Sequence, residues 1–242
     1  MKHLYANFAK LSFLLGLIVF SNTFYSQVTV TNNQTVAWYV QNVLLGANVT
    51  VSNITYNGSA ANANNTAVTS VGHLTNPGNQ IGIANGFIMA TGNATLAAQT
   101  NNGGGASLGN TAPSTSGNDV QLSTLVSGTQ FDKCIVEFDF VPLGDTLRFN
   151  YVFASDEYPE FVCSGFNDVF GFFISGPNPG GGSYTNFNVA RVPSSLNPLA
   201  YTNTPVAINT INPGVAGSSG TASTCSNIDP NWASYNIYYV GN

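Results

Sequence analysis

Charged side chains are scarce in this 242-residue sequence, where Asp, Glu, Lys and Arg together make up 6% of the residues. Five residues are Lys or Arg, and Lys2 and Lys10 belong to the N-terminal segment. Beyond it, Lys133, Arg148 and Arg191 stand against ten acidic residues, which gives a net charge of −7. Because nonspecific nucleic-acid affinity comes mainly from basic side chains that neutralise phosphates, this composition excludes nucleic acid as a partner. An anionic membrane surface is excluded for the same reason.

The sequence also lacks an apolar run long enough to cross a bilayer, which takes about 20 residues. The apolar run at residues 11–20 follows Lys2 and Lys10 and precedes small and polar residues. This order is typical of a secretory signal peptide. We therefore assign residues 1–26 as a signal peptide, and we expect a secreted or cell-surface chain with no transmembrane segment once this peptide is removed.

Metal-binding and redox motifs are absent as well. The sequence contains no C-x-x-C, and His73 is the one histidine beyond residue 26, so a zinc site is not expected. Three cysteines remain in an exported chain in which disulfides are permitted, and three pairings are open. We favour Cys163 paired with Cys225, because both lie in polar, loop-like sequence. Cys134 falls instead on the apolar side of a predicted strand.

Hydrophobic residues nevertheless make up 43% of the sequence and aromatic residues 12%, which is enough for a folded core. Residues 34–45 place apolar side chains at helical spacing and predict one short N-terminal helix, ended by Gly46. Beyond this helix, β-branched and aromatic residues alternate with polar ones, most clearly at residues 49–56 and 81–89, which indicates strands. We predict a single all-β domain over residues 27–242, built as a two-layer, jelly-roll-like β-sandwich.

Residues 133–154 predict a β-hairpin, because two runs of alternating apolar and polar residues flank a Pro-Leu-Gly-Asp turn. Pairing the two runs across this turn sets Phe138 opposite Phe149 and Asp139 opposite Arg148. A slip of one residue would turn every inward ring to solvent, so the pattern specifies the register well.

The segment VFGFFI at residues 169–174 is apolar on both faces of a strand. Such a run predicts a central strand that is covered on both sides, with Gly171 admitting a close backbone neighbour. Two covered faces in turn favour a two-layer architecture.

Five oxygen-bearing side chains gather in the segment between these strands: Asp156, Glu157, Glu160, Asn167 and Asp168. A hairpin connection would bring them together, and close carboxylates repel one another unless a cation or a basic group intervenes. Because basic residues are so few, we expect a calcium ion, which prefers oxygen ligands. Two alternatives remain: the acids simply solvate a loop, or Asp156 or Glu157 forms a glycosidase pair with Asp168.

Two aromatic residues, Tyr158 and Phe161, flank Pro159 within the acidic segment. Aromatic rings at such a place bind sugars or anchor protein partners, and we take both as candidate ligand-binding residues. The alternative is that the two rings anchor the loop to its own core.

Three segments of this chain are distinctive: VLLGANVTVSNITYNG at residues 43–58, FIMATG at residues 87–92 and FNYVFASDEYPEFVCSGFNDVFGFFISGP at residues 149–177. They resemble the choice-of-anchor L domain of bacterial secreted surface proteins. The resemblance implies a surface protein followed by an anchoring or sorting region, which in Bacteroidetes-like relatives often serves type IX secretion. Because similar sequences continue past YYVGN, the resemblance also implies that the C-terminal part of the domain is missing here. It supplies no catalytic residues.

Together these features predict a non-catalytic adhesion or binding module stabilised by calcium, with a surface glycan or protein as its ligand. The alternative function is a carbohydrate-active protein, either a sugar-binding domain or a glycosidase that uses Asp156, Glu157 and Asp168.

Overall fold

The computed structural model describes residues 28–45, 49–61, 67–98, 117–144, 146–194, 197 and 200–241. The predicted signal peptide at residues 1–26 lies outside these ranges. The strands are β1 (Thr29–Thr31), β2 (Thr50–Tyr56), β3 (Ser59–Ala60), β4 (Val71–Thr75), β5 (Asn85–Met89), β6 (Val136–Val141), β7 (Val169–Phe170), β8 (Phe173–Pro177), β9 (Ser183–Asn188), β10 (Arg191–Pro193) and β11 (Tyr201–Ala207). The helical elements are α2 (Val36–Tyr39), η1 (Val40–Leu44), η2 (Ala94–Ala98), η3 (Leu122–Thr124), α3 (Ala222–Ile228) and η4 (Trp232–Tyr238).

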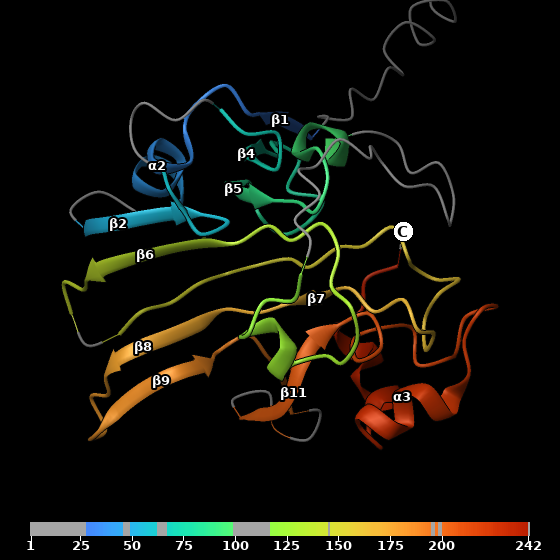
Figure 1. Ribbon diagram of the computed structural model, residues 1–242. Coiled ribbons are helices and arrows are strands. Elements are labelled where there is room, and N and C mark those ends of the chain that lie inside the picture. Colours follow the sequence, from blue (N-terminus) through green and yellow to red (C-terminus); the bar gives the residue numbers. More distant parts are fainter. Residues whose placement is uncertain are drawn as a thin grey trace, which may run out of the picture.

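The strands form small antiparallel sheets with the orders β1-β4-β5, β3-β2-β6, β10-β11-β7 and β8-β9 (Figure 1). The strands of the first two sheets lie between Thr29 and Val141, and those of the last two lie between Val169 and Ala207. This arrangement confirms the prediction of an all-β, sandwich-like fold. None of the helices within the described ranges has the length and apolar character that a membrane span needs.

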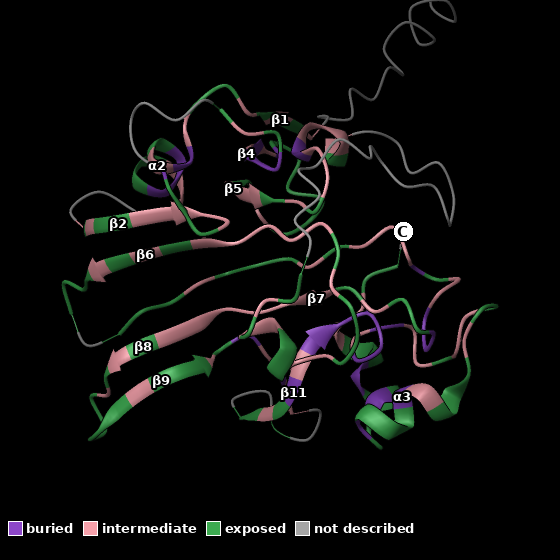
Figure 2. Ribbon diagram, viewed as in Figure 1, coloured by how far each residue is buried: buried purple, intermediate pink, exposed green. Residues whose placement is uncertain are grey.

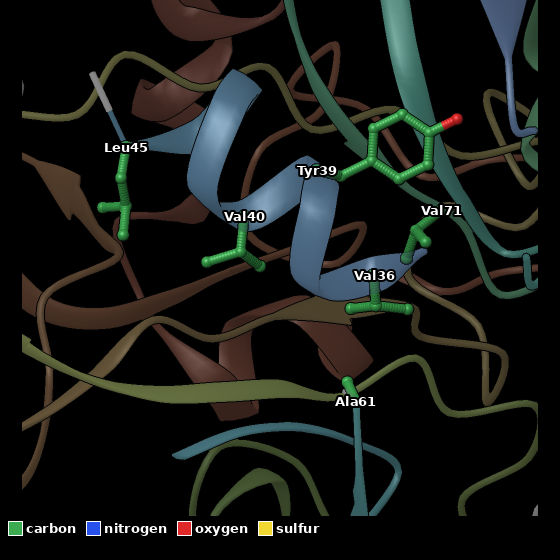
Figure 3. Packing of buried hydrophobic residues seen from close by; sticks show 6 residues of the cluster. All are labelled: Val36, Tyr39, Val40, Leu45, Ala61 and Val71. Atoms are coloured by element: carbon green, nitrogen blue, oxygen red, sulfur yellow. The ribbon is translucent and has the colours of Figure 1, made fainter. Parts of the chain in front are cut away.

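The predicted N-terminal helix is present as α2 followed by the π-helical turn η1. It begins at Thr35, whose hydroxyl accepts a hydrogen bond from the backbone N–H of Trp38 at 3.1 Å. Val36, Tyr39 and Val40 are buried on the inner face of the helix and pack with Leu45, Ala61 and Val71 (Figure 3). Because half-buried residues of β2, β5 and β6 pack against the same cluster, the helix joins two sheets into one core.

Strand β6 shows the predicted alternation, with Phe138 half-buried and Glu137 and Asp139 exposed. Its partner is β2, in a register that pairs Ser52 with Asp139 and Thr55 with Glu137. Two residues of β2 therefore lie opposite Phe138, and this extra residue forms a β-bulge in β2.

The predicted hairpin over residues 133–154 is wrong in its second strand. None of residues 146–153 belongs to a strand, and β6 pairs with β2 instead. Two rings of this segment contact the apolar run at residues 169–174: Phe149 contacts Phe172 with ring centroids 4.6 Å apart, and Tyr151 contacts Phe170 at 5.1 Å. The predicted inward face is nevertheless not buried, because Leu147 and Tyr151 are 42% and 43% exposed.

The apolar run at residues 169–174 is not one central strand. It breaks after β7, where the backbone N–H of Phe172 donates to the side-chain oxygen of Asn188 at 3.0 Å, and β8 begins at the next residue. The run is half-buried throughout. The nearest atoms to a side chain at Gly171 would be those of Phe173 and Leu125, so this glycine makes room for side chains and not for backbone.

The C-terminal part of the chain packs around two further buried clusters. Figure 2 shows buried residues on β11 and on α3, and the hydroxyl of Thr204 on β11 donates a hydrogen bond to the Asp229 carboxylate just past α3. Ile208, Cys225 and Trp232 are buried in one cluster, and Val206 and Tyr235 in the other. Helix α3 and the 3₁₀ helix η4 add helical structure that the sequence analysis did not predict.

Candidate functional site

The acidic segment, residues 155–168, forms a compact loop of consecutive turns between residues 146–153 and β7. The backbone that follows β11 holds this loop along its length. Four backbone N–H groups donate to loop carbonyls: Ser219 to Glu160 at 2.9 Å, Gly217 to Val162 at 3.0 Å, Thr221 to Cys163 at 2.9 Å and Ile208 to Asp168 at 3.1 Å. The loop is thus fixed from one side by residues 208–221.

A disulfide joins Cys163 of the loop to Cys225 of α3, with a Cα–Cα distance of 5.0 Å. This is the pairing favoured from the sequence, and both residues are fully buried. Cys134 is free, and burial raises the pKa of its thiol to about 12. The disulfide therefore ties the loop covalently to the C-terminal helix and leaves Cys134 inert in the core.

Asn209 is the central polar anchor of the loop. Its side-chain oxygen accepts the backbone N–H of Cys163 at 2.6 Å, and its amide group donates to the carbonyl of Ser164 at 2.9 Å. Its own backbone N–H donates to the side-chain oxygen of Asn167 at 3.0 Å. Because Asn209 is 1% exposed, these bonds satisfy groups that water does not reach.

Two glycines allow the close approach of the two segments. A side chain at Gly217 would overlap the carbonyl oxygens of Pro159 and Glu160. A side chain at Gly220 would meet the carbonyl of Val162. Glycine is therefore required at both positions for the backbone to lie directly against the loop.

Three of the five predicted cation ligands are brought near one another. The hydroxyl of Ser155 donates to the Asp168 carboxylate at 2.8 Å and accepts the backbone N–H of Glu157 at 3.1 Å. Partial burial, together with the charges of Asp168 and Asp156, raises the pKa of Glu157 above its ordinary value. Like charges therefore do face one another here, as the sequence predicted.

The other two predicted ligands lie in different surroundings. The Asn167 oxygen accepts a hydrogen bond from Asn209, and Glu160 lines a separate hollow of about 280 Å³ beside Pro213 and Val215. One carboxylate oxygen of Glu160, Oε2, is buried without a hydrogen-bond partner. Within the described ranges, no group of three or more His, Cys, Asp or Glu side chains lies close enough together to hold a metal ion. The acids predicted to bind calcium are thus partly close together, but the described residues do not form a preformed set of calcium ligands.

The aromatic residues of the loop are one core residue, Tyr158, and one pair of contacting rings, Phe161 and Phe166. Tyr158 is 8% exposed, and its hydroxyl donates to the carbonyl of Ile211, so it anchors the loop to the core and does not face a ligand. Phe161 is half-buried and packs edge-on against Phe166, with centroids 5.3 Å apart. Phe166 is 64% exposed. Phe166 was not predicted from the sequence as a ligand-binding residue, although its ring is more accessible than that of Phe161.

Comparison with known families supports the resemblance seen in the sequence. The model of the Choice-of-anchor L domain matches residues 27–241, which include the loop, the disulfide and the segment that clamps the loop. Neither the curated proteins nor the solved structures gave a match. The domain indicates a surface-associated or secreted protein, and the family is not known for an enzymatic activity. Since the match spans most of the sequence, this chain belongs to the choice-of-anchor L domain family.

Proposed function

We propose that the chain is a non-catalytic binding or adhesion module of a secreted or cell-surface protein, with residues 155–168 as its ligand-facing loop. The observation that carries this proposal is the clamp on the loop. A disulfide, the buried Asn209 and four backbone hydrogen bonds hold the loop in one conformation. A loop ordered before binding loses little conformational entropy on binding, which favours recognition.

Phe166 supplies the anchor expected of such a loop. Its ring is exposed, and it packs edge-on against the half-buried ring of Phe161. Its backbone is fixed as well, because the N–H of Phe166 donates to the hydroxyl of Ser164 at 3.0 Å. Rigid exposed aromatic rings are typical of binding hot spots for proteins and of stacking surfaces for sugars. The ligand of the proposal is accordingly a surface glycan or a surface protein.

Retention on solid surfaces tests this function. The full chain is passed over immobilised cellulose, chitin, peptidoglycan and collagen, and the bound fraction is measured against protein concentration. Phe166→Ala should reduce saturable retention on at least one surface, whereas Phe131→Ala, which removes another ring that is 75% exposed, should leave it unchanged. Absence of retention on every surface, or equal retention by both variants, would contradict the proposal that residues 155–168 bind the ligand.

A calcium ion at the loop is the second part of the proposal. Support comes from the repulsion that Asp156 and Asp168 exert on Glu157, which a divalent cation would relieve. The oxygen donors suit calcium better than zinc. The described residues include no group of three acidic side chains placed to bind one ion. Calcium would therefore need neutral oxygen ligands beside the acids and a rearrangement of the side chains, so we predict modest affinity.

Thermal melting in calcium and in a chelator tests the cation. Calcium at a hundredfold excess over Kd should stabilise the fold by about 2.7 kcal/mol. Asp168→Asn should abolish that gain, and Asp132→Asn, a matched change outside the loop, should retain it. Equal melting temperatures in both buffers would remove calcium from the account.

One observation favours the carbohydrate-active alternative. A carboxyl group with a raised pKa beside a second carboxylate is the pair that a glycosidase uses, and Glu157 beside Asp168 has this property. Release of reducing ends from the same polysaccharides, lost in Glu157→Gln, would establish this activity. Full retention without any released sugar would support the binding module.

A further inference from the structure

A second candidate site lies far from the acidic loop in sequence, at the outer face of α2. A hollow of about 550 Å³ opens between the helix and the β2-β3 hairpin. Gln34, Trp38 and Gln41 line it from the helical side, and Ser52 and Asn53 line it from β2. Figure 1 shows α2 lying over β2, so the hollow is formed by elements that share one core.

Trp38 is placed on this outer face because the opposite face of α2 is buried. Val36, Tyr39 and Val40 point into the core, and the indole is left 41% exposed. The ring meets Tyr39 edge-on with centroids 5.4 Å apart, a contact that fixes its orientation. Within the described part of the chain, no residue accepts a hydrogen bond from the indole N–H. A large apolar surface thus faces the hollow, with an N–H donor that has no acceptor among the described residues.

Two glutamines line the hollow together with this ring. Gln34 precedes the N-cap Thr35, and Gln41 lies in η1, three residues after Trp38. In the described ranges, neither glutamine side chain has a hydrogen-bond partner. Each amide offers both a donor and an acceptor, so the hollow has polar groups of both kinds as well as the indole.

The opposite wall is fixed by the β-bulge of β2. Asn53 adopts a positive φ of 51°, and its amide group donates to the Asp139 carboxylate at 2.6 Å. Bulges re-aim side chains and are frequent beside binding sites. Here the bulge turns the Asn53 side chain to the exposed face and holds it against β6.

The described residues that line the hollow carry no charge, and this selects the ligand class. A pyranose ring combines an apolar C–H face, which stacks on an indole, with a rim of hydroxyl groups that donate and accept hydrogen bonds. An exposed tryptophan beside amides that have no partner among the described residues is complementary to both features. We propose that this hollow, the Trp38 hollow, binds a neutral sugar residue of a glycan, independently of the loop at residues 155–168.

Tryptophan fluorescence tests the proposal directly, because the sequence has two tryptophans and the second, Trp232, is 6% exposed and donates to Ser226. The full chain is titrated with soluble hexasaccharides of glucose, xylose and N-acetylglucosamine, and with polygalacturonate as a charged comparison. We expect a saturable change in emission with at least one neutral oligosaccharide and none with polygalacturonate.

Variants separate stacking from structure. Trp38→Ala should weaken the affinity, measured by calorimetry, by about tenfold or more, as removal of a hot-spot ring does. Trp38→Tyr should keep most of it, and Gln121→Ala, which changes a half-buried glutamine outside the hollow, should match the parent chain in affinity. Circular dichroism confirms that Trp38→Ala is folded. Absence of binding by the parent chain to all three neutral sugars, or binding that survives Trp38→Ala, overturns the proposal.

Discussion

The side-chain oxygen of Asn209 accepts the backbone N–H of Cys163 at 2.6 Å, directly beside the disulfide that Cys163 forms with Cys225. One residue of the loop is therefore held twice, by a covalent bond and by a buried amide. Cys163 has a positive φ of 62°, a conformation that few residues other than glycine adopt. The double anchor keeps the loop in this turn, and the proposed binding function depends on it.

Asn209→Ala tests the polar half of this anchor. The variant leaves the N–H of Cys163 and the carbonyl of Ser164 without their partner, and each buried orphan costs about 1–3 kcal/mol. We expect urea unfolding to show a loss of about 3 kcal/mol for the two groups. Asn227→Ala, an exposed asparagine on α3, should change stability by less than about 0.5 kcal/mol. A similar small change in both variants would show that Asn209 does not anchor the loop.

Reduction tests the covalent half. The disulfide spans 62 residues of sequence, and a loop of that length stabilises the folded state by about 4 kcal/mol in the chain-entropy account. Unfolding in urea with and without reductant should show this difference in the parent chain. The double variant Cys163→Ala, Cys225→Ala should be insensitive to reductant. If reductant destabilised both proteins equally, its effect would have to come from elsewhere.

The glycine contacts lead to a third prediction. Gly217→Ala places a methyl group against the carbonyl oxygens of Pro159 and Glu160, and overpacking of this kind costs about 1–3 kcal/mol. Gly165, in the loop itself, has open space around it, so Gly165→Ala should be tolerated. Thermal melting of the two variants measures the contrast. Equal melting temperatures would mean that residues 208–221 do not press on the loop.

The raised pKa of Glu157 predicts an effect of pH on stability. Folding favours the protonated form, so this stabilisation is complete below the ordinary value of 4.5 and is lost as pH rises through the folded pKa. Glu157→Gln should therefore melt higher than the parent chain near neutral pH, and the difference should vanish in acid. Carboxyl titration by NMR should also show a lower pKa for Glu157 in Asp168→Asn. An unchanged pKa there would remove Asp168 as a cause.

Sequence patterns predicted the helix and β6 correctly, because each of these elements buries one face and exposes the other. The spacing at residues 34–45 predicted the helix, because its inner face alone is buried. Alternation predicted β6, but the same alternation at residues 146–153 did not form a strand, because Phe149 and Tyr151 pack on rings that follow them in sequence. The alternation there did not predict a buried face either, since Leu147 and Tyr151 are 42% and 43% exposed.

The candidate site was predictable to a similar extent. Local sequence placed Asp156, Glu157 and Asp168 close together, and the polar surroundings of Cys163 and Cys225 indicated the disulfide. Helix α3 escaped prediction because its sequence, ASTCSNI, has no apolar periodicity. Asn209 escaped it for a different reason, since nothing local distinguishes an asparagine that reaches a loop 46 residues earlier.

The most direct test of the central claim measures binding and turnover in one sample. The full chain is incubated with cellulose, chitin, peptidoglycan or collagen, the bound protein is quantified, and the supernatant is analysed by mass spectrometry for released sugars or peptides. The account predicts saturable retention on at least one surface, reduced in Phe166→Ala, with no released product. Released product that disappears in Glu157→Gln, or no retention on any surface, would contradict it.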